Sequence, residues 1–325
     1  MSVLVTGGAG YIGSHMTYAL LDRGEKVVVL DNLSTGNRSL VGEKAVLVEG
    51  DAGDTGLVRE IIADHAVHAA IHFAGSIVVP DSVLDPLAYY DNNTCTSRAL
   101  IEACVDGGVK NFIFSSTATV YDADTTQPLA EDDAKNPISP YARSKLMTEW
   151  MLEDASRAHD FRHMVLRYFN VAGADPQGRT GQSSPRATHL IKRAAQAALG
   201  RVPHLDIFGT DYPTRDGTGV RDYIHVSDLA DAHLLALDAL RAGAGSSTFN
   251  CGYGHGASVR EVIGTMEQVT GRKLPVREGP RRPGDPPELI ADPTRIKTTL
   301  GWRPRHDNLT EIVRSALDWE RRFNR

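Results

Sequence analysis

The first half of the chain alternates short apolar runs with stretches of mixed apolar and polar residues. The nearly continuous apolar runs cover 3–5, 27–30, 45–48, 69–73 and 112–114. Runs of this kind are typical of strands that are buried on both faces of a parallel sheet. The stretches 12–22, 57–65 and 84–105 have the amphipathic spacing of helices, and a further helix near Tyr141 precedes a strand near 164–168. This alternation predicts an α/β fold with a doubly wound parallel sheet.

The amino-acid composition of the chain changes after about Gly173. Gly, Pro, Ser and Arg become denser in 173–187, 209–219 and 278–287, and helical stretches recur at 226–240, 259–270 and 309–323. We expect a first domain over 1–173 and a smaller, mixed α/β region over 174–325. This region should lie at the carboxyl edge of the sheet, where doubly wound folds bind ligands. The strands near 221–225 and the helix 226–240 could return to the first domain.

The composition and net charge of the chain limit the classes of molecule that it is expected to bind. The chain has 325 residues, of which 41% are hydrophobic and 23% are charged, and its net charge is −6. Nucleic acids and anionic membranes demand clustered Lys and Arg, so a mildly acidic protein is not expected to bind either. An anionic small molecule stays possible, because a pocket needs only a few well-placed cations.

The cysteines and the N-terminal segment bear on the compartment. Cys95, Cys104 and Cys251 show no CxxC spacing and are odd in number, as expected for reduced thiols of a cytoplasmic protein. The segment before the first strand carries no signature of a secretory leader. No apolar stretch approaches the roughly 20 residues that a bilayer-spanning helix needs. We therefore expect a cytoplasmic location.

A glycine-rich turn directly follows the first predicted strand and opens the first predicted helix. It reads Gly7-Gly8-Ala9-Gly10-Tyr11-Ile12-Gly13. Glycines let the backbone turn tightly and approach a diphosphate, to which the helix N-terminus offers free N–H groups. Asp31 ends the second strand, where a carboxylate accepts hydrogen bonds from the adenosine ribose and repels a 2′-phosphate. Together these features predict a Rossmann-type site for NAD rather than NADP.

A second set of residues has the pattern of a proton-transfer site. Tyr141 and Lys145 stand four residues apart at the start of a predicted helix, which places both side chains on one helical face. The strand that ends in Ser115-Ser116-Thr117 supplies hydroxyl groups at the carboxyl edge of the sheet. Oxidation of an alcohol by hydride transfer to nicotinamide needs a base beside the alcohol. The pattern predicts Tyr141 as this base, Lys145 as its activator and Thr117 as a hydrogen-bond donor to the developing ketone.

Tyr141 can act as this base only if the pKa of its phenol is lowered. An ordinary Tyr has a pKa of about 10, so about one in a thousand is ionised at pH 7. The Lys145 ammonium and the positive charge of oxidised nicotinamide would both favour the phenolate. A lowering of about 3 pKa units corresponds to about 4 kcal/mol, which two cations in a closed site can supply.

Several longer motifs carry a family resemblance over nearly the whole chain. They span 6–15, 71–75, 89–93, 139–145, 166–170 and 216–226, with support from 281–285. On these residues the sequence resembles the extended short-chain dehydrogenase/reductase family, and within it the branch that epimerises UDP-hexoses at C4. The resemblance implies reversible C4 epimerisation of UDP-glucose and UDP-galactose, through a 4-keto sugar formed with tightly held NAD. It also implies a homodimer joined through a helix bundle and a role in galactose metabolism.

The resemblance further implies a set of binding residues. Those expected to contact NAD are Gly7, Gly10, Tyr11, Ile12, Gly13, Asp31, Asn32, Asp51, Ala52, Phe73, Ala74, Gly75, Asn92, Ser115, Tyr141, Lys145 and Tyr168. Those expected to contact the UDP-sugar are Thr117, Tyr141, Phe169, Asn170, His189, Leu190, Arg221, Tyr223, Arg282, Asp285 and Leu289. Arginine forks suit a diphosphate that carries about two negative charges.

Four positions depart from the family pattern. Ile77 replaces a Lys that often contacts a cofactor phosphate, and Asp122 replaces a Gly after the strand-end Tyr. His189 stands where many members have an Asn that contacts UDP, and Leu289 replaces a bulky Tyr beside the sugar. A smaller residue at 289 could admit an N-acetyl group, so UDP-N-acetylglucosamine remains an alternative substrate.

Other activities of the same fold are less consistent with the residues. Sugar-nucleotide 4,6-dehydratases place an Asp-Glu pair after the active-site Thr, whereas Thr117 is followed by Ala118-Thr119. A product-releasing reductase would use exchangeable NADPH, against which Asp31 argues. UDP-uronates or pentoses remain possible substrates, as does a catalytically silent NAD-sensing protein, although such proteins usually lose the Tyr or Lys. No metal site is expected, because no Cys or carboxylate completes a set with the histidines of 65–72.

Overall fold

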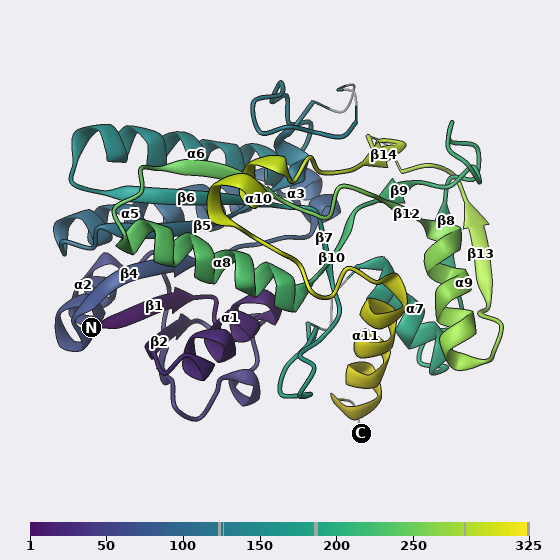
Figure 1. Cartoon of the computed structure of the whole chain (residues 1–325), viewed down its shortest axis with the longest axis horizontal. Coiled ribbons are helices and arrows are strands. Elements are labelled where there is room, and N and C mark those ends of the chain that lie inside the picture. The colour runs from purple at the N-terminus through teal and green to yellow at the C-terminus, as the bar shows by residue number, and fades with distance from the viewer. Residues whose placement is uncertain (123–124, 126, 185–187, 283, 324–325) are drawn as a thin grey trace.

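The computed structural model describes residues 1–122, 125, 127–184, 188–282 and 284–323. Its centre is a seven-stranded sheet in the order β11-β6-β5-β4-β1-β2-β3, with parallel pairing throughout (Figure 1). The strands are β1 (Ser2–Thr6), β2 (Lys26–Asp31), β3 (Val46–Glu49), β4 (Val67–His72), β5 (Asn111–Thr117), β6 (Arg162–Tyr168) and β11 (Ser247–Cys251).

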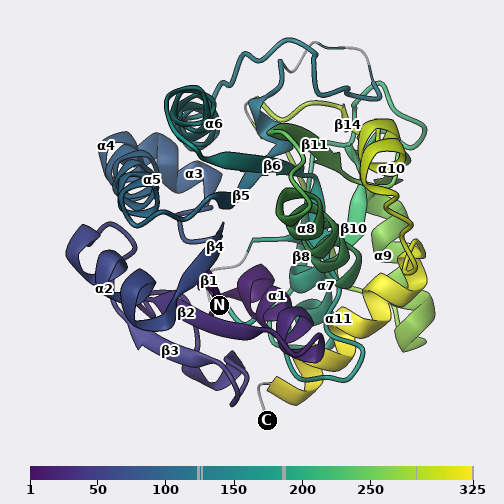
Figure 2. The same cartoon turned by 60° about the vertical axis from the view of Figure 1, so that its left-hand side comes forward.

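Helices cover both faces of this sheet. Figure 2 shows α1 (Tyr11–Asp22) and α8 (Val226–Arg241) on one side, opposite α2 (Thr55–His65), α5 (Thr96–Asp106) and α6 (Pro140–Ala158). The expected doubly wound α/β fold is thereby confirmed. No helix in the described part of the chain is long and apolar enough to span a membrane.

The apolar runs form strands because their alternate side chains supply two separate cores. Val3 and Val5 of β1 belong to the core on one face, whereas Leu4 belongs to the core on the other. In β2, Val29 and Leu30 divide between the two faces in the same way. Successive side chains of a strand point to opposite faces, so a strand between two helical layers must be apolar at every position.

The predicted helix 84–105 is wrong as a single element. The chain forms α3 (Val79–Leu84), α4 (Pro86–Tyr89), the π-helical turn η2 (Tyr90–Cys95) and then α5. Pro86 disfavours helical backbone at the preceding residue, and Asp85 is non-helical, with φ −135° and ψ 77°. Asp85 instead caps α4 by accepting a hydrogen bond from the Ala88 backbone N–H.

Elements after Gly173 divide between the main sheet and a smaller region. α8 lies against the main sheet, and β11 extends it by pairing with β6, a strand that the hydrophobic pattern did not indicate. The expected strand near 221–225 forms two short strands outside the main sheet. The elements of the smaller region, which begins with β7, are β7 (Asn170–Ala172), β8 (Leu205–Phe208), β9 (Val220–Arg221), β10 (Tyr223–His225), β12 (Ala257–Ser258), β13 (Val276–Gly279), β14 (Glu288–Leu289), α7 (Leu190–Ala198), α9 (Val259–Thr270), α10 (Thr294–Leu300) and α11 (Leu309–Phe323). Two short helices, η1 (Arg38–Leu40) and η3 (Ala118–Val120), belong to the first half of the chain.

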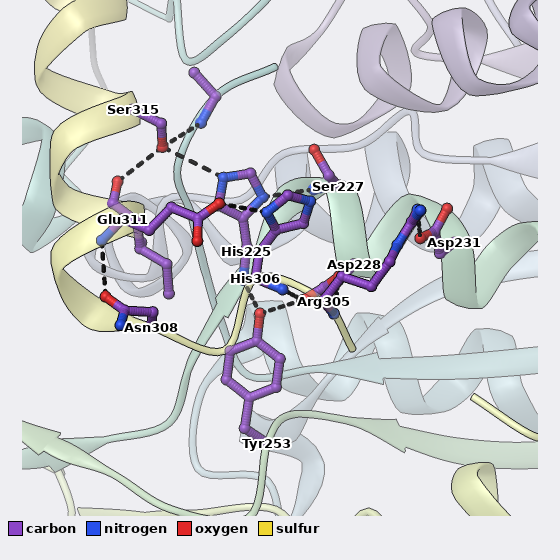
Figure 3. Close-up of polar contacts among 12 residues, drawn as sticks. His225, Ser227, Asp228, Asp231, Tyr253, Arg305, His306, Asn308, Glu311 and Ser315 are labelled. Carbon is purple, nitrogen blue, oxygen red and sulfur yellow. Dashed lines mark hydrogen bonds and ion pairs between the residues drawn. The ribbon is translucent and has the colours of Figure 1, made fainter. Parts of the chain in front are cut away.

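A polar cluster fastens the C-terminal segment to the end of β10 (Figure 3). The buried Asp228 carboxylate accepts hydrogen bonds from the backbone N–H groups of Arg305 (2.8 Å) and His306 (2.9 Å), and from the Tyr253 hydroxyl (2.6 Å). The rings of His225 and His306 stack with centroids 4.6 Å apart. Ser315 of α11 adds a 3.3 Å contact to His225. This cluster fixes the strand that carries Tyr223 against α11.

Buried histidines should make the fold sensitive to acid. Burial lowers the pKa of five histidines to about 3 or about 4: His15, His72, His163, His225 and His233. As pH falls below about 6.5, the unfolded chain takes up protons that the folded chain refuses. Stability is therefore present above pH 6.5 and is lost as pH falls toward about 4. Five such groups give a slope of up to about 7 kcal/mol per pH unit.

Urea unfolding at pH 7.5, 6.5 and 5.5 measures this slope. The urea midpoint should fall about three times further between the two lower pH values than between the two higher ones. A His163→Gln variant should show a shallower slope than the unmodified protein. A midpoint that stays constant down to pH 5.5 would contradict the prediction.

Candidate active site

The glycine turn after β1 is shaped for a ligand that approaches the backbone closely. Gly7 has a φ of +71°, and a Cβ there would lie 2.6 Å from the backbone nitrogen of Ala74. A Cβ at Gly13 would lie 2.2 Å from the Gly7 carbonyl oxygen. α1 then begins at Tyr11 with Gly10 as its N-cap, and no side chain caps it. The helix therefore presents backbone N–H groups and a partial positive charge, which suit a diphosphate.

Asp31 lies beside this turn, at the end of β2. One carboxylate oxygen accepts a hydrogen bond from the Ala9 backbone N–H at 2.9 Å, and the other accepts one from Leu33 N–H at 2.8 Å. An ionised carboxylate can accept about four hydrogen bonds, so it keeps capacity for ribose hydroxyls. Asn32 donates to Asp51 at 3.2 Å, which brings the predicted adenosine-binding residues to one edge. These residues fit NAD.

The segment after β4 is tied to α6 by an asparagine that the sequence analysis did not select. The buried Asn93 side chain accepts a hydrogen bond from Ser76 N–H (2.8 Å) and donates to the Ser76 carbonyl and the Ser144 hydroxyl (3.0 Å each). The predicted Asn92 donates to the Ser76 hydroxyl at 2.9 Å. Both lie in the π-helical turn, a feature that often occurs at functional sites. The Asn-Asn pair was the signal that could have identified Asn93.

The catalytic candidates meet at the carboxyl edge of the sheet. Ser139 caps α6 by accepting a hydrogen bond from Ala142 N–H, which fixes where the helix begins. Lys145 is buried, and its ammonium donates to the Ser115 carbonyl oxygen at 3.0 Å. The Thr117 hydroxyl hydrogen-bonds the Tyr141 phenol. Tyr141 and Lys145 lie one helical turn apart on α6, whereas the end of β5 lies many residues earlier in the chain. The structure thus brings all three together.

Burial dominates the ionisation of this pair. It raises the pKa of Tyr141 to about 12, and the hydrogen bond with Thr117 offsets only part of the rise. Burial also lowers the pKa of Lys145 to about 8. The expected lowering of the Tyr141 pKa applies to the site with cofactor bound, so it stays a prediction. The expectation required two cations, and the oxidised nicotinamide ring that would supply the second belongs to the cofactor.

Two further predicted cofactor residues lie on the side of the sheet that faces α8. The Tyr168 hydroxyl lies 2.5 Å from Nε2 of His233. The Tyr11 hydroxyl donates to the Gly173 carbonyl oxygen at 2.7 Å. These contacts join the start of α1 to the beginning of the smaller region, and the end of β6 to α8.

Cationic side chains gather in the smaller region. Arg221 donates to the Asp285 carboxylate at 2.6 Å. The Arg282 guanidinium lies 3.9 Å from the centroid of the Phe208 ring at the end of β8. Phe208 was absent from the predicted set, because a single aromatic residue at a strand end carries no local signal. The arrangement offers two guanidinium groups and an aromatic face, as expected for a nucleotide.

A buried carboxylate connects these residues to the sugar-side candidates. Asp222 accepts hydrogen bonds from the backbone N–H groups of Tyr253 (2.8 Å), Gly254 (2.9 Å) and Ala291 (3.2 Å). Its own backbone accepts from Asn170 N–H at 2.9 Å and donates to Leu289 at 3.1 Å. Asp222 therefore holds Asn170, Arg221 and Leu289 in a fixed relation.

The remaining candidates occupy nearby but separate positions. His189 precedes α7 and lies 3.3 Å from Gln182, and together with Tyr11 it lines a small cavity. Leu289 contacts the apolar cluster that contains Phe169. Two departures from the family pattern lie at the surface: Ile77 is exposed, and Asp122 accepts a hydrogen bond from Asn136.

Comparison with known proteins gives consistent matches over the whole chain. Residues 3–252 match the NAD dependent epimerase/dehydratase family. A UDP-glucose 4-epimerase of Azospirillum brasilense is 60% identical over 98% of this chain and 92% of its own length. A UDP-glucose 4-epimerase of Brucella ovis in complex with NAD has a TM-score of 0.95 and 45% identity, covering 98% of this chain and 97% of that chain. One of Bifidobacterium longum in complex with NAD+ and UDP has a TM-score of 0.94 and 36% identity, covering 99% and 98%.

Filling the glycine turn should prevent NAD binding. Gly7→Ala introduces a Cβ into backbone at positive φ and into contact with Ala74, so the turn must move away from the diphosphate position. We expect NAD affinity to fall by at least about tenfold, the effect of about 1.4 kcal/mol. Binding can be followed by the rise in melting temperature on adding NAD. Gly264→Ala is the control, because a Cβ in the middle of α9 meets nothing within 4 Å. An equal NAD-dependent rise in both variants would contradict the prediction.

Proposed function

The chain belongs to the NAD dependent epimerase/dehydratase family, and from this premise we propose that it interconverts UDP-glucose and UDP-galactose, with Tyr141, Lys145 and Thr117 as catalytic residues. The reaction inverts C4 of the hexose, so the enzyme is an NAD-dependent isomerase of carbohydrates. The observation that carries the proposal is that Tyr141, Lys145 and Thr117 lie at the same carboxyl edge of the sheet as the glycine turn and Asp31. The glycine turn and Asp31 would hold NAD, which would supply the hydride acceptor and donor for inversion at C4.

The residues of the smaller region would hold the UDP end of the substrate. Arg221 and Arg282 would pair with the diphosphate, and Asp285 would face the uridine ribose. Phe208 offers an apolar face beside the Arg282 guanidinium, where the uracil ring could lie. Asn170, Leu289 and His189 would border the hexose. Because UDP is the part of the substrate that is held firmly, the hexose can rotate within the site. Inversion at C4 requires this rotation.

The catalytic residues would then exchange a proton with O4 of the hexose. Tyr141 takes this proton as C4 is oxidised, and Thr117 donates a hydrogen bond to the oxygen that becomes a ketone. The ammonium of Lys145 stabilises the Tyr141 phenolate and reaches the cofactor ribose. After the 4-keto sugar has rotated to present its opposite face, Tyr141 returns the proton to O4. The same groups serve both directions, so the reaction is reversible.

The alternatives from the sequence analysis are less favoured. Two UDP-glucose 4-epimerases that are 60% and 45% identical over 98% of this chain favour the glucose and galactose pair over N-acetylated, uronic and pentose sugars. Tyr141, which is half-buried, and Lys145, which is buried, are both present, which disfavours a silent NAD sensor. Use of NAD together with three unpaired thiols is consistent with a reducing, cytoplasmic compartment.

Tyr141→Phe should abolish epimerisation while leaving the fold intact, because it removes only the hydroxyl that exchanges the proton. General acid–base groups contribute about 10² to 10⁴-fold, so we expect a loss of that size in kcat. The assay supplies UDP-galactose without added NAD and detects UDP-glucose with a coupled dehydrogenase. Tyr18→Phe, on α1, is the matched control and should keep normal activity.

The same assay tests the assignment of cofactor and substrate. Activity of the unmodified protein without added NAD would support tightly retained cofactor. Recovery only after NAD is added would support the epimerase and a looser site, consistent with Ile77 in place of a cation. Silence toward UDP-galactose under both conditions would reject the glucose and galactose pair.

We further propose that two copies of the chain associate through α5 and α6. A groove between these helices is lined by Ile101, Val105, Met151 and Ala155 together with charged residues. The neighbouring Trp150 side chain is 54% exposed. Apolar surface of this kind favours burial against a matching surface, and the same face on a second copy would supply it.

Met151→Glu should therefore convert the dimer into a monomer, because it buries a charge at the centre of the groove. Sedimentation velocity measures the change. Val276→Glu is the control, since Val276 is an exposed apolar residue on β13, far from both helices. A protein that already sediments as a monomer, or a Met151→Glu variant that stays dimeric, would contradict this arrangement.

A further inference from the structure

The helix that carries Tyr141 and Lys145 is joined to β5 at two successive residues of the strand. The Lys145 ammonium donates to the Ser115 carbonyl oxygen at 3.0 Å. One turn later on α6, the Glu149 carboxylate accepts a hydrogen bond from the Ser116 hydroxyl at 2.5 Å. Thr117, the hydroxyl donor of the proposed reaction, follows directly in the chain. The proposed base and the proposed donor are therefore placed relative to each other through these two bonds.

An arginine on the next strand completes the arrangement. Arg167 of β6 lies opposite Ser116 in the sheet register. Its Nε and Nη2 atoms donate to the two Glu149 oxygens at 3.1 and 2.6 Å. Its Nη1 atom donates to the Tyr121 hydroxyl and the Glu131 carbonyl oxygen at 2.9 Å each. The side chains of Arg167 and Glu149 are each 4% exposed, so protein groups satisfy this ion pair.

Strand alternation places this cluster outside the substrate site. Ser116 and Arg167 point toward α6, whereas the next register pair, Thr117 and Tyr168, points to the other face. The Tyr168 hydroxyl lies against His233 of α8, which confirms the direction of that pair. Ser116, Glu149 and Arg167 consequently act on the site only through the elements that they connect.

A buried ion pair of this kind contributes little net stability. The cost of removing both charges from water largely cancels their attraction, and well-packed apolar residues often stabilise a fold as much. The charges instead fix the orientation of α6 relative to β6, because a bidentate arginine–carboxylate pair accepts only a narrow geometry. A helix that slid by one residue would move 1.5 Å along its axis and break all three contacts with Glu149.

We propose that Ser116, Glu149 and Arg167 are positioning residues for the proposed reaction, fixing Tyr141 and Lys145 relative to Thr117. The inference rests on the proposed function. The Lys145 ammonium is hydrogen-bonded to Ser115 of β5, whereas the Tyr141 phenol is carried by α6 alone. A shift of α6 along β5 therefore changes the distance between the ammonium and the Tyr141 oxygen, which sets how far the cation lowers the phenol pKa. At an effective dielectric constant of about 20, moving the ammonium from about 4 to about 5 Å raises that pKa by about half a unit.

Ser116→Ala tests the cluster with the least disturbance, because Glu149 keeps its pair with Arg167. We expect kcat for UDP-galactose to fall by about tenfold or more, since a displacement of about 1 Å can cost about a hundredfold. The acid limb of the kcat profile should move up by about half a pH unit. KM and bound NAD should stay unchanged, because the binding residues are not altered.

Ser156→Ala is the matched control. Ser156 also lies on α6, and its hydroxyl contacts His163 of β6 at 2.7 Å, near the end of the helix away from Tyr141. Each variant removes one hydroxyl from the contact between the same helix and the same sheet. Ser156→Ala should leave kcat and its pH profile unchanged.

Glu149→Gln gives a second, independent variant. It keeps an acceptor for Ser116 but leaves Arg167 with an uncompensated buried charge, so we expect a lower urea midpoint as well as the shifted pH profile. Glu25→Gln is its control, because Glu25 forms a bidentate pair with Arg241 at the opposite end of the sheet. Glu25→Gln should lower the urea midpoint without moving the pH profile.

Two outcomes would overturn the inference alone. One is a Ser116→Ala variant with the kcat and pH profile of the unmodified protein. The other is an equal loss of activity in Ser116→Ala and Ser156→Ala, which would indicate a general structural role. Both require an active parent protein and so differ from failure of the proposed function. An unmodified protein without activity on any UDP-sugar would overturn the two together.

Discussion

The parallel pairing of strands that are buried on both faces is the constraint on which the rest of this structure depends. Each strand is apolar at nearly every position, since Val3 and Val5 enter one core and Leu4 enters the other. Parallel strands also end at the same edge, so the polar residues that follow them in sequence must gather there. That edge receives the glycine turn, Asp31 and the hydroxyls after β5, and the proposed chemistry lies there for this reason.

Burial then tunes the reactive groups. It raises the pKa of Tyr141 to about 12 and lowers the pKa of Lys145 to about 8, so the protein by itself keeps the phenol protonated. In the proposed reaction, a proton acceptor would arise only when a cationic ring and a substrate close the site. This dependence suits an enzyme that must not react before both are bound, and it makes the spacing between Lys145 and Tyr141 consequential. The buried Glu149 and Arg167 lie where they can control that spacing.

The smaller region is organised by a different means. Its strands are only two to four residues long, so sheet pairing alone cannot hold its loops. Two buried carboxylates replace it by accepting hydrogen bonds from backbone N–H groups: Asp222 near Arg221 and Leu289, and Asp228 at the C-terminal segment. Each carboxyl group accepts hydrogen bonds from more than one segment of the chain, so it can fix several loops. The side chains that are proposed to face the nucleotide therefore lie on loops that these two buried carboxyl groups hold in place.

The sequence by itself determined the fold class, the glycine turn with Asp31, and the Tyr141 and Lys145 pair. Each of these is local, because periodicity and short spacing report on one element and its termini. The tertiary structure alone decided the break at Pro86, the edge strand β11, and the roles of Asn93, Phe208 and the cluster around Glu149. These depend on contacts between residues far apart in the chain, whose partners no local pattern specifies. It also decided the balance of charge and burial at Tyr141, because the cost of desolvation is set by everything that packs around the phenol.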